Sequence, residues 1–446
     1  MNLSYFLAKR IRQGKQGDFA AVVHRIAVAS IAIGLGAAII SFLVMQGFQE
    51  TVKTKVFRFT GHLLITKYTL SNATEEQPFE LNTASVTEAM QFPFIKHIQE
   101  YSHKSGLIKT EEEVLGVVLK GVGRSFDTLR LSDYLLEGRF LHLPDSGYGR
   151  EILVSKQIAD KLNIQLHDEV TIHFFQNPPR FRKLIVVGIY ETNLSDYFDN
   201  KILIGDIRLI QRLNDWNSQT VGGVEITIDH SHFSRAEVLR FSLNSAWEQD
   251  SPWPDRLSDW IQALMGFDFE RQAEVFAGHQ INERIDYDLL VETVQQKYIP
   301  IFEWLGLLSR QVVILLVIIL IVVCVNMISV LLILVMERTP MVGVLKALGA
   351  RNQVIRRVFI YNGMNLTLKG LMLGNMIGLG FCWIQDRFAI IRLNPRDYYM
   401  DAVPIEWSWG MVIFLNLLIF FVVSLVLLLP ATLVLRIQPV KAIKFD

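Results

Sequence analysis

Four long apolar runs constrain this chain more than any other feature of its sequence. The clearest is the run 311–335, which contains no charged residue. A helix needs about 20 mostly apolar residues to cross a bilayer, and a segment exposed to lipid must satisfy its backbone polar groups internally, as a helix does. The sequence therefore predicts four transmembrane helices, at residues 26–47, 311–335, 358–385 and 409–435.

The positions of Lys and Arg predict how these helices are oriented. Basic residues near the ends of membrane spans favour the cytoplasmic side. They exceed acidic residues in the segment 1–25, around the turn 337–350 and in the tail 436–446, whereas the loop 386–408 has balanced charge. We therefore expect both termini and the turn in the cytoplasm, with that loop and residues 48–305 on the opposite side.

The long segment 48–305 has the pattern of a mixed α and β domain, because short strand-like and helix-like stretches alternate with Pro, Gly and Asn. The predicted strands are 62–66, 114–120, 151–154, 170–175, 184–190 and 224–228, and the predicted helices are 156–162, 206–213 and 235–243.

Apolar residues recur every three or four positions at both ends of this segment. The periodicity predicts helical stalks that leave the membrane unbroken, and amphipathic helices packed under the domain would give the same pattern. The residues are Phe48, Val52, Val56 and Phe59 at one end, and Val291, Val294, Tyr298, Phe302 and Leu305 at the other.

A short amphipathic helix is predicted in the turn 337–350, between the second and third runs. Thr339 suits the N-cap, Pro340 the first helical position and Gly349 the residue after the C-cap. A helix of this kind, with basic residues around it, is typical of a docking element for a cytoplasmic partner. Its apolar face follows the spacing i, i+3, i+4 and i+7 and consists of Met341, Val344, Leu345 and Leu348.

The remaining composition argues against several kinds of function. The formal net charge is zero, whereas a nucleic-acid partner requires a basic surface. Both cysteines, Cys324 and Cys382, lie in apolar runs, so we expect no disulfide framework. The basic segment 1–25 lacks an apolar core with a cleavage site, so we expect no cleaved signal peptide.

Motifs for catalysis and metal binding are absent from the sequence. It contains no phosphate-binding G-x-x-x-x-G-K-[S/T], H-E-x-x-H, C-x-x-C or G-x-S-x-G pattern. We therefore expect neither nucleotide hydrolysis by this chain nor a metal site. His62, at the start of a predicted strand, is interpreted as structural.

The third span carries glycines and one charge. Gly370, Gly374 and Gly378 recur every four residues, which lets helix backbones approach closely. We interpret this stripe as a packed interface, with a moving interface as the alternative. A charge at the depth of Lys369 costs about 2.5–3.5 kcal/mol on insertion scales, so we expect its side chain to reach the near surface or a structural partner, with a functional role as the alternative.

Phe42, Met45, Gln46 and Phe48 cluster at the outer end of the first span. Met and Phe form an adaptable apolar surface that suits an acyl chain. Ordinary lipid contact or helix packing is the alternative.

A set of motifs along nearly the whole chain carries a family resemblance. The strongest is NMISVLLILVMERTPMVGVLKALGA at 326–350, and others are VMQGFQE at 44–50, GREILVSKQIADKLNIQLHDEV, FRKLIVVGIY, DYYMDAVPIEW and the basic end LRIQPVKAIKFD. Together they resemble the MacB/FtsX-type ABC transporter permeases, and within them the lipoprotein-releasing Lol permeases. The first motif is similar to the family's second span and coupling helix.

The resemblance implies a type VII ABC fold: an α-helical membrane domain with four transmembrane helices, and a large α+β periplasmic domain inserted between the first and second helices. It also implies an inner-membrane location and pairing with a second permease copy or a paralogue. Two copies of a separate ATPase subunit would bind ATP and Mg, so this chain would hold no cofactor itself. The residues implied to couple to the ATPase are Glu337, Met341, Val344, Leu345, Lys346, Leu348 and Gly349.

The implied cargo is a triacylated lipoprotein, passed to a periplasmic carrier by movements that the stalks transmit. Membrane lipids and the cargo would meet a cavity lined by the outer half of the second span and by Phe42, Met45, Gln46 and Phe48. Two alternatives stay open: a MacB-like efflux permease, although MacB-like chains carry their own ATPase domain, and an FtsX-like regulator of cell-wall hydrolases, although FtsX-like inserts are smaller.

Two segments depart from the family pattern. The hairpin 174–181, FFQNPPRF, is shorter than the hook with which Lol permeases recruit their carrier. We therefore do not expect carrier capture through a long hook, although Pro178 and Pro179 suit a stiff tip. The segment 250–282 is longer and richer in Trp than the family pattern.

Overall fold

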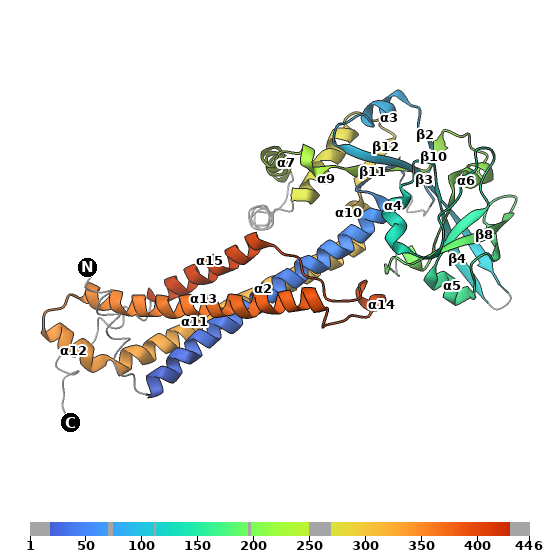
Figure 1. The fold of residues 1–446 in the computed structure, drawn as a ribbon. Coiled ribbons are helices and arrows are strands. Elements are labelled where there is room, and N and C mark those ends of the chain that lie inside the picture. Colours follow the sequence, from blue (N-terminus) through green and yellow to red (C-terminus); the bar gives the residue numbers. More distant parts are fainter. Residues whose placement is uncertain (1–17, 70–74, 111–112, 195–197, 249–268, 429–446) are drawn as a thin grey trace. The chain divides into compact units, whose positions relative to one another are not determined.

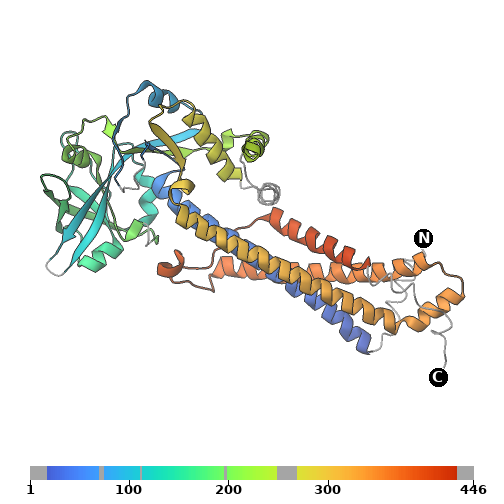
Figure 2. The same cartoon turned by 180° about the vertical axis from the view of Figure 1, so that it is seen from behind.

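The chain divides into two compact units, each shown from two sides in Figures 1 and 2. The computed structural model describes residues 18–69, 75–110, 113–194, 198–248 and 269–428. The helical unit comprises Met1–Thr51, Glu303–Leu393 and Asp401–Asp446. The α/β unit comprises Val52–Phe302 and Asn394–Met400.

Among the described residues, four helices are long and apolar enough to cross a membrane: α2 (Asp18–Thr60), α11 (Ile299–Glu337), α13 (Asn352–Phe388) and α15 (Trp409–Val426). Each begins within or before one of the predicted runs. Helices α2 and α11 have 43 and 39 residues, about twice what a bilayer requires, so both continue past their apolar runs. The tail 436–446 and most of 1–25 lie outside the described residues.

The core of the helical unit is built from aliphatic side chains of different helices. Ile31 and Leu35 of α2, Val323 of α11 and Ile419 of α15 all belong to one buried cluster. Helix α13 lies beside α2 and α15 in both views (Figures 1 and 2). Because neighbouring helices in lipid gain little from burying apolar surface, close packing is what holds such a cluster together.

A sheet of ten described strands forms the centre of the α/β unit, in the order β12-β1-β11-β3-β4-β9-β6-β8-β5, with β7 pairing to β3 and β8. Most pairs are antiparallel, but β4–β9 and β6–β8 are parallel. A separate pair joins β2 and β10. The strands are β1 (Leu63–Lys67), β2 (Phe79–Glu80), β3 (Ile95–Lys109), β4 (Val114–Val122), β5 (Leu135–Gly138), β6 (Glu151–Ser155), β7 (Glu169–Phe174), β8 (Arg180–Tyr190), β9 (Ile202–Asp206), β10 (Thr220–Val221), β11 (Gly223–Ile228) and β12 (Leu289–Thr293).

Short helices pack around this sheet, and local sequence fixes their ends. Helix α5 begins where the hydroxyl of Ser155 accepts the N–H of Ile158, and it ends at Asn163 in the left-handed region (φ 52°). The helices are α3 (Ala84–Ala89), α4 (Thr128–Leu131), α5 (Lys156–Leu162), α6 (Ile207–Leu213), α7 (Arg235–Glu248), α9 (Phe269–Asn282), α10 (Val294–Lys297) and α14 (Pro395–Tyr398).

Helix α14 belongs to the α/β unit although it lies between α13 and α15 in the sequence. Lys55, near the end of α2, donates a hydrogen bond from Nζ to the carbonyl oxygen of Tyr399 at 2.6 Å, and another to that of Thr192 at 3.2 Å. The segment Asn394–Met400 is thereby attached to the rest of this unit.

The six predicted strands all occur, as do the three predicted helices, with small shifts of their ends. The helical stalk predicted from Val291 is wrong in its first part. Residues Leu289–Thr293 form β12, which pairs with β1, and α10 and α11 follow it. A capping box between Thr293 and Gln296 starts α10. Over a stretch of only five residues the spacing of apolar side chains cannot separate a strand from a helix. Pairing with β1 makes this stretch a strand.

Candidate functional site

Helix α12 (Thr339–Ala347) occupies the turn between α11 and α13. Its N-cap is Arg338, so the prediction of Thr339 as N-cap is wrong: the Thr339 hydroxyl donates to the carbonyl oxygen of Val335 at 3.1 Å and stands inside the helix. Pro340 follows as the second helical residue, where its missing N–H costs no hydrogen bond. Gly349, just after the C-cap Leu348, has φ +86° and ends the helix.

The structure splits the predicted apolar face of α12 between two sides. Leu345 contacts a cluster formed with Ile355 and Phe359 of α13, and the fully buried member of α12 in that cluster is Val342, which lies outside the predicted face. Val344 and Leu348 point away, with exposed fractions of 50% and 79%. One side of the helix thus fixes it to its own unit, while the other leaves an apolar ridge uncovered.

The remaining predicted coupling residues lie around this ridge. Glu337, the last residue of α11, is exposed, and Met341 and Lys346 are half-buried. A ridge of aliphatic side chains bordered by charged groups is suited to a protein partner, since apolar contact at the centre with a polar rim is the usual composition of interfaces.

The glycine stripe of α13 lies against α2. A Cβ atom on Gly370 would lie 2.6 Å from Cβ of Ile31, and one on Gly374 2.9 Å from Cβ of Leu35. At Gly378 it would lie 3.1 Å from the Cα of Gly36. No larger residue fits without separating the two backbones, so these glycines set the distance between α13 and α2.

The four residues predicted to line a lipid cavity lie in different surroundings. Phe42 is buried in the core of the helical unit, and Met45 packs against the same core. Gln46 is partly buried, and its Oε1 has no hydrogen-bond partner among the described residues. The ring of Phe48 meets that of Trp304 edge-on, with centroids 5.4 Å apart. Within the described chain these side chains make packing contacts, and a lipid cavity at this position stays a prediction.

Three further polar side chains of the helical unit lie on α13 and α15. Lys369 lies on the exposed surface of α13, next to the buried Gly370. Asn375 and Asn416, which the sequence alone does not indicate as a pair, are hydrogen-bonded between α13 and α15. Their distance of 41 positions along the chain left no local signal from which the pair could have been found.

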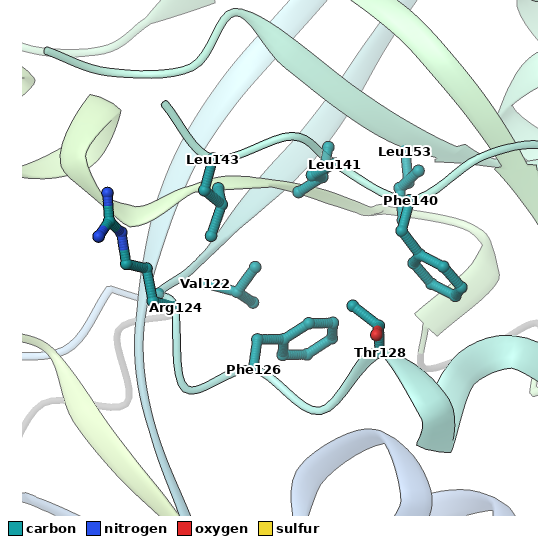
Figure 3. Close-up of a pocket in the computed structure, with 9 residues that line it drawn as sticks. Val122, Arg124, Phe126, Thr128, Phe140, Leu141, Leu143 and Leu153 are labelled. Carbon is teal, nitrogen blue, oxygen red and sulfur yellow. The ribbon is translucent and has the colours of Figure 1, made fainter. Parts of the chain in front are cut away.

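A cavity of about 270 Å³ opens in the α/β unit (Figure 3). Arg124 stands at one edge, where it pairs with Asp145 at 2.6 Å. The lining contains no His, Cys, Asp or Glu, and its hydroxyl group is that of Thr128. The lining residues are Val122, Gly123, Arg124, Phe126, Thr128, Phe140, Leu141, Leu143 and Leu153.

His62, His230 and Glu274 are the described residues that come nearest to a metal site, with one ligand atom from each lying within 4.8 Å of the others. The Nδ1 atom of His62, however, accepts the N–H of Ile228 at 3.2 Å. In that state the neutral ring carries its proton on Nε2 and has no lone pair left for a metal. The geometry therefore supplies two donors rather than three, and the absence of a metal stays a prediction.

The charges of this group follow from burial. Burial, with His230 nearby, lowers the pKa of His62 to about 3, so its ring is neutral. Burial also acts to lower the pKa of His230, but the carboxylate of Glu274 raises it overall, with His230 Nε2 3.7 Å from Glu274 Oε1. The group is a neutral histidine beside a histidine–carboxylate pair, which fits a structural role.

The hairpin between β7 and β8 is present, and its tip is apolar and exposed. Phe175 and Phe181 have exposed fractions of 65% and 60%. Arg180 fixes one side of the tip by donating to the carbonyl oxygen of Leu213 at 2.8 Å and to Asp215 at 3.0 Å. Most of the Trp-rich segment 250–282 lies outside the described residues, apart from its helix α9.

Comparison with known proteins gives matches along most of the chain. Residues 26–231 match the MacB-like periplasmic core domain, and residues 313–439 match the FtsX-like permease C-terminal domain. The lipoprotein-releasing system transmembrane protein LolE of Haemophilus influenzae is 20% identical over 99% of this chain and 99% of its own length. LolC of Neisseria meningitidis is 21% identical over 98% of this chain and 97% of its own.

Among solved structures, the periplasmic region of MacB from Actinobacillus actinomycetemcomitans is similar, with a TM-score of 0.30 and 11% identity, over 55% of this chain and 95% of that one. Permeases of this family work with ABC ATPase partners. With both domain models matched in one chain that also carries helices long enough to span a membrane, the protein belongs to the MacB/FtsX-type ABC transporter permeases.

Proposed function

We propose that this chain is the membrane subunit of an ATP-driven complex that releases lipoproteins from the inner membrane for delivery to the outer membrane. The observation that carries the proposal is the uncovered ridge of Val344 and Leu348 on α12, which supplies a contact for a partner ATPase. Relatives named as lipoprotein-releasing proteins match almost end to end, which supports this cargo over others.

In this proposal both termini and α12 face the cytoplasm, as the excess of Lys and Arg near them favours. The α/β unit then lies in the periplasm. The partner ATPase, in two copies, binds ATP and Mg, and a second permease copy or a paralogue completes the membrane part. Closure of the ATPases on α12 would move α11 and α13, and the long helices α2 and α11 would carry that movement outward.

The carrier would contact the β7–β8 hairpin, where Phe175 and Phe181 are exposed. A carrier that binds lipid chains presents apolar surface, and exposed aromatic side chains suit contact with such a surface. Replacing both side chains with Asp should then reduce transfer to the carrier without reducing ATP hydrolysis, whereas loss of both activities would place the defect elsewhere.

Depletion of the chain in its own organism tests the proposed cargo. Outer-membrane lipoproteins should accumulate in the inner membrane, as measured by membrane fractionation and mass spectrometry of the lipid-modified N-termini. If lipoproteins still reach the outer membrane and an adaptor protein copurifies with the chain, an efflux permease is the better assignment. Unchanged lipoproteins with a defect in cell division would instead favour a regulator of cell-wall hydrolases.

A further inference from the structure

The last turn of α2 is anchored inside the α/β unit. Its helix ends at Thr60, and Gly61, with φ +79°, turns the chain directly into β1. The N–H of His62 then donates to the carbonyl oxygen of Ile226 on β11 at 2.8 Å. A Cβ on Gly61 would lie 2.9 Å from that same oxygen. The helix and the sheet therefore meet without a flexible connection.

A buried lysine holds the end of this helix from the sheet. Nζ of Lys120, in β4, donates to the carbonyl oxygen of Phe59 at 2.9 Å and to Oε1 of Glu225, in β11, at 2.6 Å. Both side chains of the ion pair are only 2% exposed. A cation at the C-terminal carbonyls of a helix is also favoured by the helix dipole.

Gln99 and Arg130 close this contact into a ring. Gln99 Nε2 donates to Glu225 Oε2 at 2.5 Å, and Gln99 Oε1 accepts the N–H of Asp127 at 3.3 Å. Asp127 caps α4, and Arg130 at the other end of α4 donates to the carbonyl oxygen of Phe57 at 3.0 Å. These hydrogen bonds thus form a closed series that starts at Phe59 of α2, passes through β4, β11, β3 and α4, and ends at Phe57 of the same helix.

The start of α11 reaches the same place through aromatic contacts. The ring of Phe59 lies 4.4 Å from that of Phe198, and the ring of Phe198 lies 5.5 Å from that of Tyr298, the residue before α11. Phe57 stacks on Phe302 of α11 with centroids 6.1 Å apart. The ends of both long helices therefore share one contact region in the α/β unit.

A buried ion pair is a poor choice for stability alone, because apolar residues of similar size often serve a core equally well or better. It differs from apolar packing in being directional, since each charge-assisted hydrogen bond fixes one donor and one acceptor. At this position the fixed acceptor is a backbone carbonyl of α2, which ties rotation or axial displacement of the helix to β4 and β11.

We propose that Lys120, Glu225 and Gln99 are positioning residues that pass movement of α2 to the sheet of the α/β unit, which rests on the proposed function of an ATP-driven release machine. They touch neither nucleotide nor cargo. Removing the hydrogen bonds among these three side chains should leave ATP hydrolysis in place and lower the number of lipoproteins released per ATP hydrolysed.

The test uses the full permease with its ATPase in lipid vesicles, with a triacylated lipoprotein as cargo. The double variant K120M/E225L removes both charges together, so no unpaired charge stays buried. We expect ATP hydrolysis within about twofold of the wild type and release per ATP lowered at least about fivefold, the range of a typical coupling between distant sites. K120R, which keeps the charge and the donors, should recover part of the ratio.

A matched control removes another ion pair from β3 of the same unit. Lys104 pairs with Glu75 at 2.9 Å and its side chain is 7% exposed, and the other oxygen of Glu75 accepts the N–H of Ser105 in the same strand. K104M/E75L should keep the wild-type ratio. Because a folding defect lowers hydrolysis and release together, only loss of coupling changes the ratio. If K120M/E225L fails to fold, Q99M opens the ring with little change in volume and decides the question in the same assay.

A second readout separates this inference from the proposed cargo. ATP binding should change hydrogen exchange of the amides of β4 and β11 in the wild-type complex and leave them unchanged in K120M/E225L. If the wild type releases no lipoprotein but its β4 and β11 amides respond to ATP and those of K120M/E225L do not, the proposed cargo is wrong and the proposed role of Lys120, Glu225 and Gln99 is supported. If the double variant keeps the wild-type release per ATP and the wild-type exchange response, the proposed role of these three residues is wrong.

Discussion

Asn375 of α13 and Asn416 of α15 exchange hydrogen bonds. Nδ2 of Asn375 lies 2.7 Å from Oδ1 of Asn416, and Nδ2 of Asn416 lies 3.0 Å from Oδ1 of Asn375. Each amide also donates to a carbonyl oxygen of its own helix, of Leu371 or Val412, at 2.8 Å. Both protons of both amides are thus used, which makes the pair a polar contact that holds α13 to α15 in a hydrocarbon environment.

Replacing one partner of this pair should destabilise the helical unit. N375L leaves the amide of Asn416 without its partner, and interhelical hydrogen bonds in membranes average about 0.6 kcal/mol, with a maximum near 1.7. We expect the free energy of unfolding to fall by about 1 kcal/mol, measured in detergent with a graded denaturant. The double variant N375L/N416L should lose less than the sum of the two single variants, and additive losses would mean that the amides act independently.

The glycine stripe predicts a position-dependent response to added volume. A Cβ on Gly374 would lie 2.9 Å from Leu35 Cβ and 3.0 Å from the carbonyl oxygen of Ala32, whereas one on Gly380 of the same helix meets nothing within 4 Å. G374V should therefore lower the unfolding temperature of the purified permease and G380V should not. Equal effects of both variants would mean that helix propensity, rather than contact with α2, sets the response.

The uncovered ridge of α12 predicts loss of the ATPase contact when it becomes charged. Leu348 is 79% exposed, so L348D should cost little in folding, while a carboxylate in an apolar interface costs several kcal/mol. We expect copurification with the ATPase, and the ATPase activity that depends on the permease, to fall at least about tenfold. L348M keeps the apolar contact and serves as the control. A complex of L348D that is as stable and active as the wild type would remove the ridge from the interface.

The buried His62 predicts a pH dependence of stability. Its pKa is lowered from 6.5 to about 3 in the folded protein, so between these values the unfolded chain binds a proton that the folded chain does not. Stability should therefore fall as the pH drops from 6.5 toward 3, by at most about 1.4 kcal/mol per pH unit. H62N keeps an acceptor for Ile228 but cannot titrate.

Thermal unfolding of wild type and H62N at pH 7 and pH 5 measures this effect. The wild type should lose more stability than H62N between the two values. The exposed His142 provides the control, since H142N should follow the wild type. An identical pH response of wild type and H62N would show that protonation of His62 is not linked to folding.

The membrane helices were predictable because each run satisfies a simple physical requirement of length and apolarity. The run 311–335 lies within α11. Helix α12 was the exception in detail. The spacing placed Leu345 on one face with Val344 and Leu348 and left out Val342, because only packing against Ile355 and Phe359 shows which of these side chains are buried.

In the α/β unit the sequence predicted strands whose apolar residues are contiguous or alternate regularly. It missed β3, IKHIQEYSHKSGLIK, which is the longest strand described, because polar residues dominate its pattern. They are accommodated by partners from elsewhere, such as Glu225 for Gln99 and Glu76 for His103. For the same reason Lys120 fell in a predicted strand without any sign that it would be buried.

The segment Asn394–Met400 has a practical consequence for anyone who wishes to cut this protein apart. The chain passes between the units at Thr51–Val52, Phe302–Glu303, Leu393–Asn394 and Met400–Asp401, so no single contiguous piece holds the whole α/β unit. A soluble fragment of residues 52–302 would lack Tyr399 and leave Nζ of Lys55 without one of its acceptors. Supplying residues 394–400 through a short linker, or as a peptide in trans, would restore that acceptor and give crystallographers a more faithful target.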